Sequence, residues 1–181
     1  MVDITNKITT LRTAIAQAVV KVGSAETIQA ILDKKVPKGD VLEVSRTAGL
    51  FAIKNTSSVI PDCHPIPIEY TGIHFECFED IIIIEVTVKT IYKTGVEVEA
   101  MHGASIVALT IYDMLKPIDK NVEISLVKLL HKKGGKSDFA TKENLNLNVA
   151  VLVCSDSIGE GAFIVEVAFR DSRPQRRSAT G

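Results

Sequence analysis

The chain has 181 residues, 46% of them hydrophobic, so it can bury the core of one domain and leaves little room for a second. Its net charge of −1 excludes a general nucleic-acid binder, which would carry a clear basic excess. The three cysteines have no paired spacing, which favours a reducing cytoplasm, and no apolar run is long enough to span a bilayer.

The first part of the chain predicts a strand followed by two helices. Residues 13–22 are apolar and rich in Ala and Val, which fits a helix or a strand, and a strand is favoured. Ser24 is placed to cap a short helix that ends near Leu32. Asp40 is placed to cap a helix over residues 41–57, whose expected inward-facing residues are Val44, Ala48, Phe51 and Ala52.

The second part predicts a hairpin, a long helix and a last strand. Closely spaced prolines exclude a helix from residues 60–67, which should form an ordered loop. Residues 70–78 and 81–92 predict an antiparallel pair, and residues 122–130 predict a final strand. With a helix over residues 95–116, this order indicates an α+β, ferredoxin-like fold in which helices pack on one antiparallel sheet.

The helix over residues 95–116 carries charged residues along one side. Glu99, His102, Asp113 and Lys116 recur at steps that place them on one face, and a second face is wholly apolar: Ala104, Ala108, Ile111 and Leu115. Glu99 and Asp113 lie ~21 Å apart along a straight helix, so one small substrate cannot bridge them within one subunit. If both ends serve one site, that site is built from two chains.

Two basic segments are candidate anion sites. Lys38 precedes the helix cap at Asp40, where free N–H groups and the helix dipole favour anions, although capping alone explains Asp40. The loop over residues 132–137 places Lys132 and Lys136 around two glycines whose N–H groups could reach phosphate oxygens. An ordinary basic surface turn is an equal alternative there.

Cys63 and His64 lie between prolines. Neither a Cys nor a His at ligand spacing accompanies them, so a zinc site is not indicated. A rigidly held His suits proton transfer or phosphate binding, with a structural loop residue as the alternative. Asp113 and Lys116 form either a surface ion pair or, in apolar surroundings, an acid/base pair.

Several separate motifs, all in register, resemble one family. They are Met1-Val2-Asp3-Ile4, Lys38-Gly39-Asp40-Val41, Ala48-Gly49, Ala52-Ile53-Lys54, Ile60-Pro61 with Cys63-His64-Pro65, Gly95-Val96-Glu97 with Glu99-Ala100, Tyr112-Asp113-Met114 with Lys116, and Gly134-Gly135-Lys136-Ser137. Across about residues 1–138 the chain resembles cyclic pyranopterin monophosphate synthase, the molybdenum cofactor biosynthesis protein C family.

The resemblance implies a lyase that converts 3′,8-cyclo-7,8-dihydroguanosine triphosphate to cyclic pyranopterin monophosphate and diphosphate. It implies a cytoplasmic homo-hexamer, a trimer of dimers with sites at subunit interfaces, and no nucleic-acid or membrane partner. No cofactor is required, no metal site is indicated, and assistance by Mg²⁺ is left open. By motif, the catalytic residues are Asp113, Lys116, Lys38 and His64, and the substrate-binding residues are Asp62, Cys63, His64, Glu97, Val98, Glu99, Lys132 and Lys136.

Some positions depart from the family pattern. Asp62 stands where Leu is usual, and its carboxylate would oppose a triphosphate unless it points away. Pro117 follows Lys116 where Ala is usual, so the helix should kink or end there, and His102 and Gly103 stand where the family has small helix residues. No departure removes a catalytic residue. The alternative function is a non-catalytic nucleotide-binding or assembly subunit that keeps the fold.

The remainder of the chain differs in character. Residues 148–157 resemble the opening strand and loop of the molybdopterin adenylyltransferase family, but too few residues follow to complete a nucleotide-binding domain. The arginine-rich tail from Arg170 has no periodicity and is expected to be disordered. We therefore expect a synthase domain over residues 1–140 and, over residues 141–181, a linker and partial strand without adenylyltransferase activity.

Overall fold

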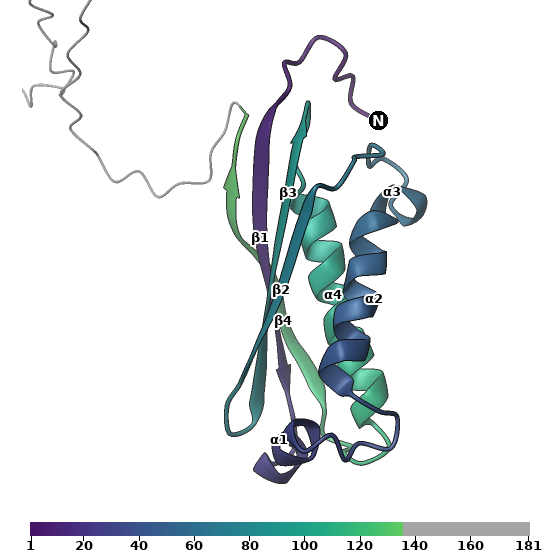
Figure 1. The fold of residues 1–181 in the computed structure, drawn as a ribbon, viewed down its shortest axis with the longest axis vertical. Helices are drawn as coiled ribbons and strands as arrows, with labels where there is room; N and C mark the ends of the chain where they lie inside the picture. Colours follow the sequence, from purple (N-terminus) through teal and green to yellow (C-terminus); the bar gives the residue numbers. More distant parts are fainter. Residues whose placement is uncertain (136–181) are drawn as a thin grey trace, which may run out of the picture. The chain divides into compact units, whose positions relative to one another are not determined.

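The computed structural model describes residues 1–135, which contain one antiparallel sheet with the strand order β2-β3-β1-β4 (Figure 1). The strands are β1 (Thr10–Lys21), β2 (Tyr70–Cys77), β3 (Ile81–Tyr92) and β4 (Glu123–Lys133). The helices are α1 (Ala25–Leu32), α2 (Val41–Lys54), the short α3 (Thr56–Val59) and α4 (Glu97–Leu115). This β-α-β-β-α-β order, with β1 and β3 central, confirms the α+β, ferredoxin-like prediction.

Several predictions concern residues beyond that range. Lys136 and all expectations for residues 141–181 lie outside the described residues. Within residues 1–135, none of the helices has the length and apolar character needed to cross a membrane.

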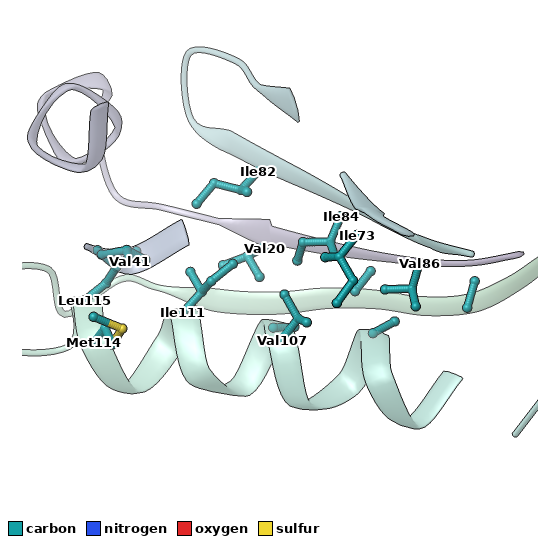
Figure 2. Packing of buried hydrophobic residues seen from close by; sticks show 14 of the residues in the cluster. Val20, Val41, Ile73, Ile82, Ile84, Val86, Val107, Ile111, Met114 and Leu115 are labelled. Carbon is teal, nitrogen blue, oxygen red and sulfur yellow. The ribbon is translucent and has the colours of Figure 1, made fainter. Parts of the chain in front are cut away.

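The core lies between the sheet and α4. Alternate residues of β1 and β3 are completely buried, which settles residues 13–22 as a strand; on β1 these are Ala14, Ala16, Ala18 and Val20. The predicted apolar stripe of α4, from Ala104 to Leu115, is buried against them (Figure 2). Three small Ala side chains in the middle of β1 allow α4 to lie close to the sheet.

Helix α2 packs against α4 through small residues. A Cβ on Gly49 would collide with Val107, and a Cβ on Gly103 would come within 2.6 Å of Ile53. The predicted inward face of α2 is therefore partly wrong: Ala52 is buried, but Val44 and Phe51 are 44% and 64% exposed. The close helix–helix contact selects small side chains, so the buried face is Val41, Ser45, Gly49, Ala52 and Ile53.

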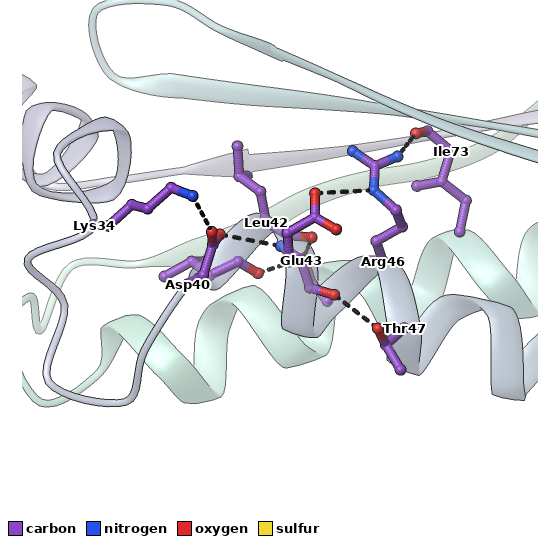
Figure 3. A network of polar contacts seen from close by, with 9 residues as sticks. Lys34, Asp40, Leu42, Glu43, Arg46, Thr47 and Ile73 are labelled. Carbon is purple, nitrogen blue, oxygen red and sulfur yellow. Dashed lines mark hydrogen bonds and ion pairs between the residues drawn. The ribbon is translucent and has the colours of Figure 1, made fainter.

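A polar network holds the start of α2 (Figure 3). Asp40 caps the helix as predicted, accepting a hydrogen bond from the Glu43 amide at 3.2 Å, and it forms an ion pair with Lys34 at 2.8 Å. Arg46 pairs with Glu43, donates to the Ile73 carbonyl of β2, and stacks over the Phe75 ring. The network fixes α2 to β2 and closes the loop that precedes α2.

Helix ends are held by buried polar groups. Asp119, beyond α4, accepts hydrogen bonds from the Gly23 amide at 2.6 Å and the Thr27 hydroxyl at 2.9 Å. At the other end of α4, His102 Nδ1 lies 3.1 Å from the Thr56 hydroxyl of α3, which supports the structural role expected of His102. Ser24 makes no side-chain cap to α1, and α4 ends at Leu115, before Pro117.

Candidate functional site

One cluster of charged residues lies at the C-terminal end of α4. Asp113 is in the last turn, and Lys116 follows the helix, three residues on. Their predicted pair is present, with Lys116 Nζ 2.7 Å from Asp113 Oδ1. The structure adds Lys38 from the loop before α2, whose Nζ lies 2.6 Å from Asp113 Oδ2 and donates to the Asp113 carbonyl at 2.9 Å.

Electrostatics fix the charge of this cluster. Hydrogen bonds from Lys116 and then Lys38 lower the pKa of Asp113 to about 2, and Asp113 in turn raises the pKa of Lys116. At neutral pH the cluster is a carboxylate held between two lysines. The Asp113 and Lys116 side chains are 51% and 53% exposed, so the dry surroundings expected from their apolar neighbours are absent in a single subunit.

Backbone geometry presents Lys38 to Asp113. The loop is bracketed by two residues in the left-handed region, Lys34 at φ 57° and Gly39 at φ 104°. The Lys34–Asp40 ion pair joins its two ends, and the buried Val36 anchors its middle in the core. The loop that carries Lys38 to Asp113 is therefore held at both ends and in its middle.

A pocket of about 560 Å³ lies at the N-terminal end of α4. It gathers the predicted residues of the loop after α3 and of the first turn of α4: Asp62, Cys63, His64, Glu97, Val98 and Glu99. Thr94 and Gly95, from the turn between β3 and α4, complete one side. Residues that are distant in sequence therefore line one pocket.

Glu99 is the buried carboxyl of this pocket, only 3% exposed. Burial, with a smaller contribution from the charge of Glu97, raises the pKa of Glu99 above its ordinary value. The same burial effect, followed by the charges of Glu99 and Asp62, raises the pKa of the Cys63 thiol. A carboxyl with a raised pKa can take up and release a proton closer to neutral pH.

Lys132, near the end of β4, contacts one of the residues that line the pocket. Its Nζ lies 3.0 Å from Glu97 Oε1, and both side chains are largely buried, at 26% and 30% exposure. The ion pair joins two residues that the motifs predict for the site, one near the end of β4 and one in the first turn of α4.

Asp62 also lines the pocket rather than pointing away; its side chain is 90% exposed and lies 2.9 Å from the amino group of Met1.

Sequence reasoning missed four residues of the N-terminal segment that line the pocket, and it gave no role to Arg12, which lies outside that lining. Residues Met1, Val2, Ile4 and Lys7 line the pocket, and the only signal for them is the opening motif, to which no site role was given. The buried Arg12 of β1 donates to the carbonyls of Tyr92 and Lys93, at 3.2 and 3.3 Å. A Cβ on Gly135 would collide with its guanidinium, so Arg12 lies directly beside the glycine pair that follows β4.

The two clusters do not form one site within this chain. Val98 and Glu99 belong to the first turn of α4 and Asp113 to its last, so the helix separates them by ~21 Å. The structure thus assembles the predicted residues as two half-sites, one at each end of α4.

Comparisons with known proteins identify the family of this chain. A model of the MoaC family matches residues 1–135, the range that holds both half-sites. The chain belongs to the MoaC family. A relative from Clostridium perfringens (strain SM101 / Type A), named cyclic pyranopterin monophosphate synthase, is 51% identical over 139 residues, covering 76% of this chain and 87% of the relative.

Other MoaC relatives extend the comparison. The protein of that name from Geotalea uraniireducens (strain Rf4) is 48% identical over 145 residues, covering 79% of this chain and 90% of its own length. A molybdenum cofactor biosynthesis bifunctional protein from Chlorobaculum tepidum is 45% identical over 161 residues, which cover 89% of this chain and 50% of that protein. An alignment of that length extends into residues 141–181.

Proposed function

We propose that this chain is a cyclic pyranopterin monophosphate synthase, a lyase of molybdenum cofactor biosynthesis. Its reaction converts 3′,8-cyclo-7,8-dihydroguanosine triphosphate to cyclic pyranopterin monophosphate and diphosphate. The observation that carries the proposal is the pocket at the start of α4, which gathers six of the residues expected from the motifs within the range matched by the family.

The pocket suits the rearrangement of the base. Opening and reclosing the ring consists of proton transfers, which need groups that change protonation near neutral pH. Burial raises the pKa of Glu99, and the His64 imidazole lines the same pocket. We assign proton transfer to His64, and contact with the forming pterin to Cys63, Val98 and Glu99.

The cluster at the other end of α4 suits the phosphate chemistry. Closing the cyclic phosphate requires attack at phosphorus with diphosphate leaving, and cations stabilise the charge that develops. Lys38 and Lys116 supply positive charge beside Asp113, which holds both ammonium groups in place. Lys116 is the proposed acid of the pair, because its ammonium group carries the proton at neutral pH and lies 2.7 Å from the Asp113 carboxylate.

Assembly follows from the separation of the half-sites. We propose a homo-oligomer, a hexamer built as a trimer of dimers, in which one subunit's pocket meets another subunit's Lys38–Asp113–Lys116 cluster. Large apolar side chains that a single subunit leaves exposed support it: Val44, Leu50 and Phe51 on α2, Leu109 and Tyr112 on α4, and Ile124, Leu126 and Leu130 on β4.

The proposal assigns the chain no resident cofactor, since the reaction needs proton transfers and a displacement rather than electron transfer. Any Mg²⁺ that takes part is expected to bind together with the triphosphate. A comparison of turnover in EDTA with turnover in added Mg²⁺ tests whether the ion takes part. A cytoplasmic location fits a nucleotide substrate. We assign the synthase activity to residues 1–140 and no adenylyltransferase activity to residues 141–181, although their similarity to the bifunctional relative supports a shared origin.

Mass spectrometry after incubation with the cyclic dihydroguanosine triphosphate tests the proposal. Release of diphosphate together with cyclic pyranopterin monophosphate is the expected result. Binding of the substrate without diphosphate release would instead favour the non-catalytic subunit. The Lys116→Gln variant is the control, because it should lose turnover while the oligomer, measured by native mass spectrometry, stays intact.

A further inference from the structure

One wall of the pocket comes from the segment before β1. Residues 1–7, here called the strap, contribute Met1, Val2, Ile4 and Lys7 to the lining. In Figure 1 this segment rises beyond the end of β1 and returns toward α3. No strap residue belongs to the hydrophobic core, so the fold does not need the strap for its packing.

The strap nevertheless has a defined conformation. Asp3 Oδ1 accepts hydrogen bonds from the Thr5 amide and hydroxyl, both at 2.8 Å, and the Lys7 amide donates to the Ile4 carbonyl at 3.1 Å. These contacts form two successive turns. Lys93, just after β3, donates from Nζ to the Thr5 carbonyl at 3.0 Å and so ties the turns to the sheet.

The strap also contacts a proposed catalytic residue. His64 Nε2 lies 2.9 Å from the Val2 carbonyl oxygen. A carbonyl oxygen can only accept, so Nε2 must carry the hydrogen of this bond. In neutral His64 the free acceptor is then Nδ1, and the Val2 carbonyl fixes which ring nitrogen can take up a proton.

The strap adds a cation to a wall that is rich in carboxylates. Asp62, Glu97 and Glu99 line the pocket, and Lys132 is already paired with Glu97. Among the residues that the structure describes, Lys7 forms no ion pair, although it lines the same pocket. A substrate with a triphosphate needs unpaired cations near its oxygens, and Lys7 is available.

We propose that the strap is a working part of the site: the Val2 carbonyl holds His64 so that it exchanges protons through Nδ1, and Lys7 binds phosphate oxygens of the substrate. This inference rests on the proposed function, since it assigns the strap to the same substrate. Lys93 is a positioning residue, because it reaches the site only through the Thr5 carbonyl.

Three variants with the same charge change test the strap. Lys7→Met should raise KM about tenfold, the loss expected for one charge-assisted hydrogen bond, and leave kcat nearly unchanged. Lys93→Met should raise KM and also lower kcat severalfold, because a loosened strap releases both Lys7 and His64. Lys89→Met is the matched control: it lies on β3 and contacts the Tyr70 ring, away from the strap.

A double-mutant cycle tests whether Lys7 and Lys93 act together through the strap or as two independent surface charges. If Lys93 acts by placing the strap, the Lys7→Met/Lys93→Met protein has the KM of the Lys93→Met protein alone. If the KM increases of the two single variants multiply in the double variant, the inference is overturned. It is also overturned if Lys89→Met raises KM as much as Lys7→Met and Lys93→Met do.

Binding of inorganic triphosphate, measured by calorimetry, distinguishes this inference from the proposed function. Weaker binding in the Lys7→Met and Lys93→Met proteins, with wild-type binding in Lys89→Met, supports the strap even if the chain releases no diphosphate from the nucleotide. Equal binding in all four proteins overturns the role of Lys7, whatever the turnover.

Discussion

The separation of the half-sites predicts that two inactive variants restore activity to each other. Glu99→Gln damages the pocket at the start of α4, and Lys116→Gln damages the cluster at its end. Each pure variant should be inactive, because every site contains one damaged half. A mixed dimer, however, contains one site with both halves damaged and one site with both halves intact.

The size of the effect follows from the geometry. The half-sites are ~21 Å apart along α4, so each site must draw its two halves from different chains. Random mixing of the two variants makes half of the dimers mixed, and each mixed dimer has one intact site in two. The mixture should therefore recover about a quarter of wild-type activity.

The assay is diphosphate release after the variants exchange subunits, with exchange verified by native mass spectrometry. As a control, wild type mixed equally with the Glu99→Gln/Lys116→Gln protein should lose about half of its activity, because no mixed dimer has an intact site. If the two single variants exchange subunits and recover nothing, the sites lie within single chains and the two-chain reasoning is refuted.

Three further predictions concern stability. Gly103→Val places methyl groups against Ile53 and should lower the free energy of unfolding by about 1–3 kcal/mol, visible as a lower Tm; an unchanged Tm would contradict the close packing of α2 on α4. Asp119→Ala leaves the Gly23 amide and the Thr27 hydroxyl without their acceptor and should cost about 2 kcal/mol in urea unfolding. Asp33→Ala serves as its control, because it removes an exposed carboxylate at the C-cap of α1 whose partners, Gln29 and Lys35, are solvent-accessible. The folded pKa of Glu99 lies above its ordinary value of 4.5, so its ionisation penalises the folded state as pH rises from about 4.5 through that pKa. The Glu99→Gln protein should therefore gain stability relative to wild type across this range, and a constant difference between the two from pH 4 to pH 8 would argue against the raised pKa.

The elements of the fold were predictable where one physical pattern dominates. The β-branched, apolar character of residues 81–92 and the prolines in residues 60–67 have few alternative interpretations, and both predictions hold. The inward face of α2 is different, because large apolar residues at Val44 and Phe51 suggest a core that the contact with α4 excludes. A helix that meets another helix at Gly49 is oriented by shape, which a count of apolar residues does not measure.

The site was predictable in its parts rather than in its arrangement. The motifs name His64 and Glu99, and the length of α4 separates Glu99 from Asp113, yet sequence spacing alone does not pair Lys38 with Asp113 across 75 residues. That contact depends on the loop closed by Lys34 and Asp40. The strap was missed for a related reason: Val2 and Thr5 contribute through their backbone carbonyls, which carry no signal in side-chain chemistry.

The environment of Cys63 has a chemical consequence for the enzyme's own survival. Burial and the neighbouring charges of Glu99 and Asp62 raise the pKa of its thiol, so at neutral pH it stays in the neutral form. The thiolate is the form that attacks electrophiles. Ring opening and reclosure pass through imine and carbonyl groups, which a thiolate in contact with them would capture as a dead-end adduct. Burial, together with the carboxylates around Cys63, thereby lets a sulfur atom line the pocket without inactivating the protein during turnover.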